Sequence, residues 1–291
     1  MLDYLQTAFD GALFGTTYAL VGIGFTLIFG VMRKINMSYA AGSLTAAYLG
    51  LSAGYLRPDA AGLVIATATL SGGLIGAIIY LTCFYFIPRK NELASLLASV
   101  GALLTFEELL VHATQGMPSA YPSVVDGRPW IVGSFVVRQD LLVTFLFCLA
   151  AMAIFLFVLY RTRLGMATRA VSQQPVAARL CGIALERVNL LTFVLTGLLG
   201  GLAGSLVGTS VGVLSPRLAL PLSIKGLIVA VIGGLGSIPG AIVAGVMIGA
   251  FENMSQELRG VTERDIYVML LLFVFLLVRP SGLFGKHRFR D

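Results

Sequence analysis

Charged residues are scarce in this sequence of 291 residues. Asp, Glu, Lys and Arg make up 12% of it, hydrophobic residues make up 57%, and the mean hydropathy is +0.91. An average soluble domain carries about 25% charged residues, because its surface must face water. A chain this apolar cannot cover itself with polar groups, so we expect its solvent to be lipid. The shortage of charge excludes a soluble enzyme, a nucleic-acid-binding module and a disordered scaffold.

Cysteine and histidine are scarce as well. Cys83, Cys148 and Cys181 lie far apart, and two of them sit in apolar runs, which argues against a disulfide framework or a zinc site. His112 and His287 lack metal-ligand spacing. The sequence has no Walker phosphate loop, no His/Glu metal motif and no serine elbow on a soluble sheet. We therefore expect no catalytic centre, metal or cofactor on this chain.

Long apolar runs fill most of the chain. About 20 mostly apolar residues are needed to cross the hydrocarbon core of a bilayer. Eight runs qualify or come close, and together they predict an all-α polytopic membrane protein with about eight transmembrane helices. They cover about 12–32, 37–56, 61–87, 93–111, 141–160, 188–213, 224–251 and 266–278.

The connections between these runs differ in charge. Segment 161–187 carries five arginines against Glu186 alone, and an excess of Lys and Arg marks cytoplasmic loops. This orientation places the N-terminus and the loop 113–139 on the outer side of the membrane. It places the basic tail from Arg279 onward in the cytoplasm. We expect residues 1–291 to form one membrane domain with these two loops on opposite sides.

A single crossing by 224–251 would leave the basic tail outside, so we expect this run to be broken in its middle. A glycine- and proline-rich stretch there would unwind the helix and form a re-entrant hairpin, with 252–265 returning to the outside. An ordinary crossing with a further break inside 188–213 is the alternative. The residues of the predicted break are Gly233, Gly234, Gly236, Ser237, Pro239 and Gly240.

Two other features of the apolar runs point to packing or function. Pairs of glycines four residues apart, at 11 and 15, 197 and 201, and 245 and 249, let helices approach closely in lipid. Glu107 and Glu108 are candidates for a buried charge pair, because carboxylates are costly in a membrane. Their position near the predicted outer interface equally allows them to extend to water.

The cytoplasmic segment 161–187 has the pattern of a docking element. Pro175 suits the first position of a short helix and Gly182 suits its end. Such a helix would present Ala177 and Ala178 on an open surface, although a plain positively charged loop would not require this order. Ala177-Ala178-Arg-Leu-Cys-Gly182 retains part of the cytoplasmic motif by which ABC-transporter permeases engage their ATPases. Val176 replaces the usual leading Glu, and the downstream Pro is missing.

The whole chain resembles the permeases of the branched-chain amino acid ABC transporter family, and the LivH-like subunit in particular. Matching segments occur at 15–24, 30–36, 163–170, 233–240 and 279–285. The resemblance implies a subunit of the bacterial inner membrane that works with a second, LivM-like permease and a periplasmic solute-binding protein. It also implies two cytoplasmic ATPases, which would bind ATP and Mg and contact Arg169, Gln173, Gln174, Pro175, Ala177, Ala178 and Gly182.

One departure from the family concerns the solute. After Asn36 the family usually continues with an aromatic, a small residue, His, Gly and an acid, whereas here 37–42 contains neither His nor acid. The solute could therefore be urea, an amide or an aromatic acid in place of leucine, isoleucine or valine. Polar residues within apolar runs are candidates for the translocation path, although bonds between helices explain them equally well. They are Tyr18, Asn36, Ser38, Tyr39, Thr192, Thr196, Ser205 and Thr209.

Functions of other classes remain open from the residues alone. A stand-alone secondary transporter or channel would need an inverted repeat and functional charges within the membrane. The sequence shows only a faint similarity between the glycine-rich stretches 15–30 and 224–240, which is weak evidence for such a repeat. An intramembrane enzyme would need a catalytic set, which the sequence lacks.

Overall fold

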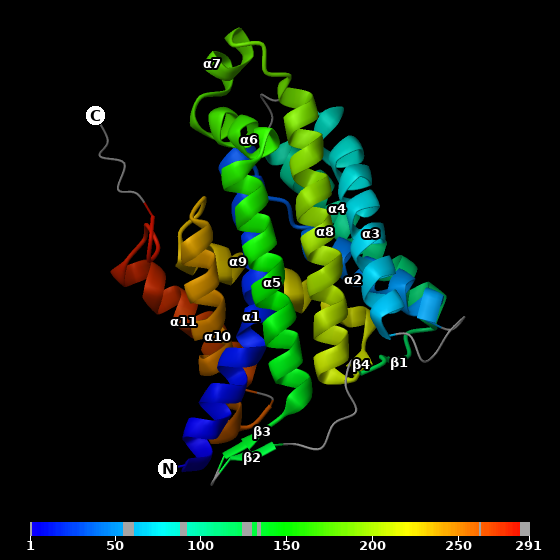
Figure 1. Ribbon diagram of the computed structural model, residues 1–291, viewed down its shortest axis with the longest axis vertical. Coiled ribbons are helices and arrows are strands. Elements are labelled where there is room, and N and C mark those ends of the chain that lie inside the picture. Colours follow the sequence, from blue (N-terminus) through cyan, green and yellow to red (C-terminus); the bar gives the residue numbers. More distant parts are fainter. Residues whose placement is uncertain are drawn as a thin grey trace.

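The computed structural model describes residues 2–54, 61–87, 92–123, 130–132, 135–261 and 263–285, and it is helical nearly throughout (Figure 1). The basic tail 286–291 lies outside the described residues, as do 124–129 and 133–134 of the predicted periplasmic loop. The helices are α1 (Leu2–Met32), α2 (Tyr39–Gly54), α3 (Ala61–Tyr80), α4 (Glu92–Thr114), α5 (Gln139–Arg161), α6 (Arg163–Gln173), α7 (Pro175–Leu180), α8 (Leu185–Val211), α9 (Ala219–Gly233), α10 (Ile238–Arg259) and α11 (Arg264–Val278).

The prediction of an all-α polytopic membrane protein is confirmed. Within the described ranges, seven helices are long and apolar enough to cross a membrane, while α2 and α11, at 16 and 15 residues, are shorter. A π-helical turn, Leu81–Tyr85, extends α3, and a 3-10 turn, Pro216–Leu218, precedes α9. Two antiparallel strand pairs were not predicted. They join β1 (Ser119–Ala120) to β4 (Val213–Leu214) and β2 (Trp130–Val132) to β3 (Phe135–Val137).

Helix α1 is the central element of the bundle. Nearly all of its residues from Gly11 to Ile28 are buried, and it contacts α5, α6, α8, α9 and α10. A helix that is apolar on all sides is stable only when other helices surround it. The helix begins at Leu2, ten residues before the predicted span, because its first turns extend beyond the apolar run and include Asp3 and Asp10.

Glycine spacings set the two main helix interfaces. Gly11 and Gly15 of α1 face Gly249 and Gly245 of α10, and a Cβ on Gly15 would lie 2.5 Å from the Gly245 carbonyl oxygen. Gly72 of α3 meets Gly197 of α8 in the same way, backbone against backbone. Small residues allow this approach in lipid, where no hydrophobic effect drives helices together.

The predicted break between two helices is present. Helix α9 ends at Gly233 and α10 begins at Ile238, with Gly234 and Gly236 at φ +100° and +92°. Ser237 caps α10 by accepting a hydrogen bond from the Gly240 N–H at 3.3 Å. Residues 252–259 of the stretch expected to return to the outside continue α10, and α11 begins at Arg264. The side of the membrane on which this stretch lies stays a prediction. The alternative break inside 188–213 is absent, since α8 runs unbroken through it.

The two ends of the bundle carry different elements. Helices α6 and α7 lie at one end, and the N-terminus lies at the other with the strand pair β2–β3 (Figure 1). The described part of 113–139 therefore lies at the opposite end of the molecule from 161–187, which is compatible with their opposite predicted sides.

The substitution Gly15→Leu should destabilise the bundle. The added side chain meets the backbone of α10, which cannot move aside as a flexible side chain would. We expect a loss of about 1–3 kcal/mol or more, the usual effect of overpacking a close-packed site. Thermal unfolding followed by fluorescence-detected size exclusion in detergent measures it. Gly101→Leu is the matched control, because a Cβ there has no atom within 4 Å, and an equal loss in both variants would contradict the prediction.

Candidate functional site

Helix α6 connects the protruding part of segment 161–187 to the bundle. Its Thr162 cap accepts a hydrogen bond from the Gly165 N–H at 3.2 Å, and the helix buries Gly165, Thr168 and Val171. It contacts α1, α5 and α8. The guanidinium of Arg169 lies 5.2 Å from the centre of the Tyr160 ring, a cation–π geometry that ties α6 to α5. This helix was not predicted, because its buried residues are few and small and it lacks a stripe of large apolar side chains.

Helix α7 protrudes at the tip of the bundle and has the predicted ends (Figure 1). Pro175 stands at its start, and Gly182 follows it with φ +81°. Gln173, Gln174, Pro175, Ala177 and Gly182 are exposed.

The expectation that Ala178 lies on an open surface was wrong. This residue is only 5% exposed and packs in the core cluster, because the helix turns Ala177 outward and its neighbour inward.

The outer surface of α7 carries two exposed apolar side chains that were not among the predicted site residues. Val176 is 72% exposed and Leu180 is 85% exposed. Beside them lies a hollow of about 270 Å³, lined by Arg179, Gly182, Ile183, Ala184, Leu185 and Glu186. Exposed apolar side chains with a polar rim mark surfaces that bind another protein. We call Val176, Ala177 and Leu180 the α7 face.

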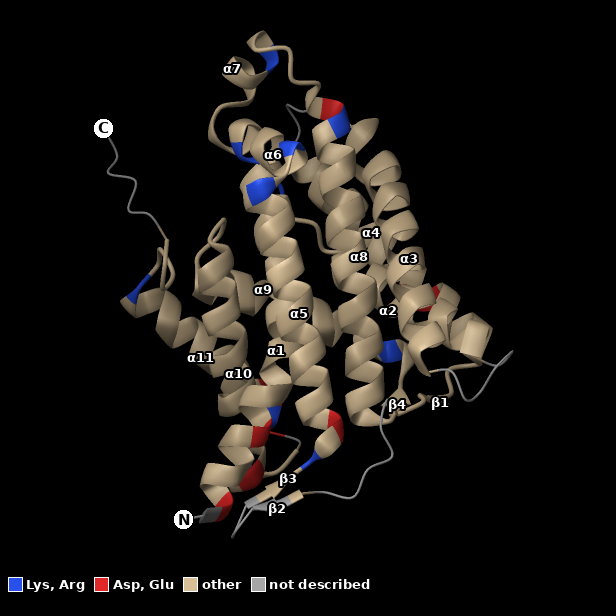
Figure 2. Ribbon diagram, viewed as in Figure 1, with Lys and Arg blue, Asp and Glu red and all other residues tan. Residues whose placement is uncertain are grey.

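The charges divide between the two ends of the bundle. Figure 2 shows Lys and Arg gathered around α6, α7 and the start of α8, and most Asp and Glu near the N-terminus and the strands β2 and β3. This is the asymmetry that the sequence analysis used to predict the orientation.

All eight predicted path residues are buried within the chain. One group lies where α2 begins. The Asn36 side-chain oxygen accepts hydrogen bonds from the Ser38 hydroxyl at 2.7 Å and the Ser38 N–H at 3.2 Å. The Tyr39 hydroxyl donates to the Thr196 carbonyl oxygen at 3.0 Å, which joins α2 to α8. Four of the eight residues are thus brought together in two adjoining contacts.

The hydroxyls on α8 bond to their own helix. Thr192, Thr196, Ser205 and Thr209 donate to carbonyl oxygens three or four residues earlier, at 2.8 to 3.1 Å. These bonds satisfy the hydroxyls inside the bundle. The role of these four residues in the translocation path stays a prediction.

Tyr18, the remaining predicted path residue, belongs to a buried charge cluster that the sequence analysis missed. Its hydroxyl donates to Glu252 Oε1 at 3.3 Å. The same oxygen lies 2.7 Å from Lys225 Nζ and 3.1 Å from Arg264 Nε. Lys225 Nζ also lies 3.2 Å from Asp265 Oδ1. Four helices, α1, α9, α10 and α11, contribute to these five side chains.

The cluster is electrically balanced, and its Lys225–Glu252 pair is deeply buried. It holds two cations and two anions, and the side chains of Lys225 and Glu252 are only 10% and 3% exposed. Glu252 lies seven residues before the end of α10, about 10 Å along the helix axis. Removing one partner of such a buried pair typically costs 3–5 kcal/mol, because the other charge stays buried. Charges within a membrane bundle are therefore candidates for function.

The predicted buried pair on α4 is wrong by contrast. Glu107 is half-buried and Glu108 is exposed, so the two carboxylates do not share a buried site. The signal that could have found the actual cluster is Lys225, a lone cation inside the apolar run 224–251 that a membrane would not tolerate without a partner.

Three of the segments that carried the family resemblance meet at one junction. The Leu283 N–H donates to the Ile232 carbonyl oxygen at 2.8 Å, and the Phe284 N–H donates to the Gly233 carbonyl oxygen at 3.2 Å. Segment 279–285 is thus hydrogen-bonded to the end of α9. Gly30 of α1 lies against Gly236 of the turn that follows, where a Cβ would be 3.5 Å from the Gly236 Cα. The junction joins 30–36, 233–240 and 279–285 in space.

Comparison with known proteins finds relatives over nearly the whole chain. The family model described as "Branched-chain amino acid transport system / permease component" matches residues 7–278. The LivH high-affinity branched-chain amino acid permease protein of Salmonella typhimurium is 32% identical over 98% of this chain and 96% of its own length. The corresponding BraD protein of Pseudomonas aeruginosa is 29% identical over 97% and 96%.

A solved structure shares the fold. It is described as an inward-facing metal-chelate type ABC transporter, and it is 16% identical with a TM-score of 0.51 over 94% of this chain and 85% of its own. The matched family model covers the helices that form the charge cluster, the α6–α7 segment and two of the three segments of the junction, 30–36 and 233–240. The chain belongs to the family of permease components of branched-chain amino acid transport systems.

Proposed function

We propose that this chain is one of two permease subunits of an ATP-driven importer that carries a branched-chain or closely related amino acid across the bacterial inner membrane. The observation that carries the proposal is the match over nearly the full length of both this chain and LivH. The chain itself performs no chemistry and binds no nucleotide. ATP and Mg are held by two cytoplasmic ATPase subunits, a periplasmic protein delivers the solute, and a LivM-like permease forms the other half of the path.

The α6–α7 end is the cytoplasmic end in this proposal. Its excess of arginine supports that orientation, because positive charge is retained on the cytoplasmic side. The N-terminus and the loop 113–139 then face the periplasm, and the chain ends in the cytoplasm. Residues 161–187 serve as the coupling segment of a single permease domain.

The α7 face is the contact with an ATPase subunit. Helix α7 offers exposed apolar side chains at an end of the molecule that lies outside the membrane in this orientation. Movement of α7 reaches the bundle through α6, which packs on α1, α5 and α8. Closure of the two ATPases would in this way shift the long helices that border the path.

The eight predicted path residues, from Tyr18 to Thr209, line the translocation path in this proposal. The residues at 37–42 differ from the family pattern, so urea, amides and aromatic acids remain alternative solutes for the same importer. A transport assay separates these solutes directly.

Purification and transport together test the proposal. This chain, tagged and purified in mild detergent, should copurify with a second permease and two ATPase subunits identified by mass spectrometry. The complex in proteoliposomes, supplied with its binding protein, should import leucine, isoleucine or valine in an ATP-dependent manner. A partner-free homo-oligomer would contradict the importer. Import of urea or an aromatic acid in place of these amino acids would contradict the proposed solute and support the ATP-driven importer.

The native Cys181 reports the orientation. It is exposed beside α7, whereas Cys83 and Cys148 are buried. A membrane-impermeant maleimide should label the chain in inside-out vesicles and leave it unlabelled in intact spheroplasts. The variant Cys181→Ser provides the control and should lose the label in both. Labelling of Cys181 from the periplasmic side would contradict the proposed orientation.

The substitution Leu180→Asp should uncouple the permease from its ATPases. A charge on the centre of a protein contact typically costs at least about 2 kcal/mol, which is more than tenfold in binding. We expect a loss of copurifying ATPase and of substrate-stimulated ATP hydrolysis, with insertion unchanged. Val261→Asp, on an exposed apolar residue at the other end of the bundle, is the control. Unchanged ATP hydrolysis in Leu180→Asp would show that α7 is not the contact.

A further inference from the structure

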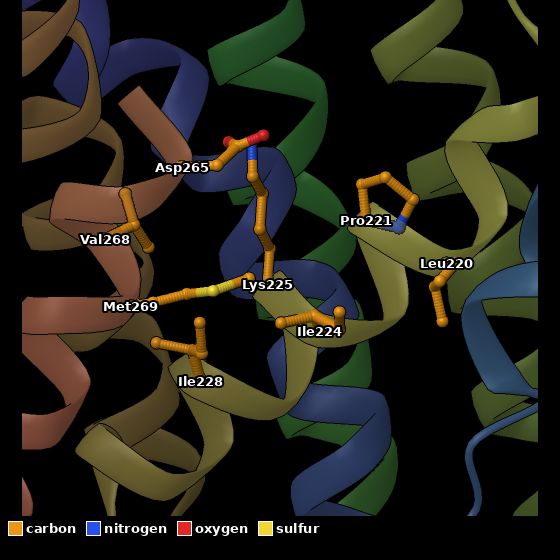
Figure 3. Close-up of a pocket in the computed structure, with 8 residues that line it drawn as sticks. All are labelled: Leu220, Pro221, Ile224, Lys225, Ile228, Asp265, Val268 and Met269. Carbon is orange, nitrogen blue, oxygen red and sulfur yellow. The ribbon is translucent and has the colours of Figure 1, made fainter. Parts of the chain in front are cut away.

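A small pocket lies between α9 and α11, beside the charge cluster. It has a volume of about 100 Å³. Its walls are almost entirely apolar, and its lining residues are Leu220, Pro221, Ile224, Lys225, Ile228, Asp265, Val268 and Met269. Figure 3 shows the apolar side chains of Ile224, Ile228 and Met269 around the stem of Lys225, with the charged groups of Lys225 and Asp265 meeting at one end.

This part of the surface does not suit contact with lipid. The Asp265 side chain is 51% exposed, and Lys225 reaches the same opening. Ionised side chains in membrane proteins face the bundle interior or a water-filled cavity, because hydrocarbon cannot solvate them. Other residues of α11, such as Phe273 and Leu277, are apolar and exposed and suit lipid. The opening between α9 and α11 therefore faces water or protein.

The two charged groups at the opening retain capacity for a ligand. An ammonium has three donors. Among the described residues, Lys225 donates a hydrogen bond to Glu252, pairs with Asp265 at 3.2 Å and lies 5.5 Å from the centre of the Tyr18 ring, which leaves one donor for a ligand. The carboxylate of Asp265 engages Lys225 and Arg264 through Oδ1 alone. One donor and one carboxylate oxygen thus stand side by side above an apolar pocket.

We propose that this pocket is a transit site for an aliphatic α-amino acid. The amino acid's carboxylate accepts a hydrogen bond from Lys225, its ammonium donates to Asp265, and its branched side chain enters the pocket between Ile228 and Met269. The site recognises both charges of a zwitterion and a short alkyl group together. This inference rests on the proposed function as an amino acid importer. It adds a position on this chain where the solute pauses after release from the binding protein.

Saturation-transfer NMR tests the site directly. The probe is leucine, added to the assembled transporter in lipid nanodiscs without the binding protein, so that only the membrane subunits can bind it. We expect transfer to the leucine methyl groups. The analogue 4-methylpentanoate lacks the ammonium and 3-methylbutylamine lacks the carboxylate, so each should bind about tenfold more weakly, the effect of losing one charge-assisted hydrogen bond.

Two variants place the binding in this pocket. Asp265→Asn should weaken leucine binding about tenfold while keeping the buried contact of Lys225 with Glu252. Met269→Phe should also weaken it by filling the pocket. Met247→Phe, on a methionine of equal exposure on α10 and outside the pocket lining, should bind leucine as the unaltered chain does. Size exclusion confirms assembly, and Met269→Phe decides the question if Asp265→Asn fails to assemble.

The results separate this inference from the proposed function. If the unaltered transporter imports leucine but leucine affinity is unchanged in both Asp265→Asn and Met269→Phe, the site is overturned and the importer stands. The same holds if leucine gives no transfer at all. If the transporter imports no aliphatic amino acid, the proposed solute and the site both fall. Leucine binding that both variants weaken and Met247→Phe preserves supports the site.

Discussion

The close contact of α1 with α10 is the constraint on which the rest of the bundle depends. Lipid offers no hydrophobic drive for helices to associate, so contact must come from packing and from polar groups that meet across helices. Glycines at 11, 15, 245 and 249 let the two backbones touch. A tyrosine side chain in a helix inclines toward the N-terminus, and Tyr18 thereby reaches Glu252 on the facing helix. Without the glycine contact the two residues would stand too far apart.

The charge cluster is tolerable only because of this packing. An ion pair in an apolar bundle gains from mutual attraction only when its geometry is good and its remaining groups are satisfied. Glu252 Oε1 is met by the tyrosine hydroxyl, the Lys225 ammonium and the Arg264 guanidinium, whereas Glu252 Oε2 is buried without a hydrogen-bond partner among the described residues. The cluster also fixes α11, a short helix whose residues are otherwise largely exposed. Charge complementarity thus attaches α11 at one end of the bundle, whereas glycine packing joins the long helices along their length.

The positions of the helices along the chain could be predicted well from the sequence, but the contacts between side chains of different helices could not. Membrane spans follow from local composition, so the runs 93–111 and 141–160 fall inside α4 and α5. The α9–α10 break could also be predicted, because glycines with positive φ and a proline act on their own neighbours. The facing of Ala178 depends on the rotation of one short helix against α8. The pairing of Lys225 with Glu252 joins residues 27 positions apart on different helices, and no local pattern announces it.

Coupling between the two ends of this protein requires an element that touches both. Helix α1 meets α6 near one end, carries the glycine contact in its first half, and presents Tyr18 to the charge cluster. It is buried nearly throughout from Gly11 to Ile28, so a displacement of this helix must displace the helices packed around it. In the proposed importer, a displacement of α6 by an ATPase would thus act on the same helix that contacts Glu252. Because Glu252 is bonded to Lys225, that movement would alter the opening between α9 and α11 at the far end of the bundle.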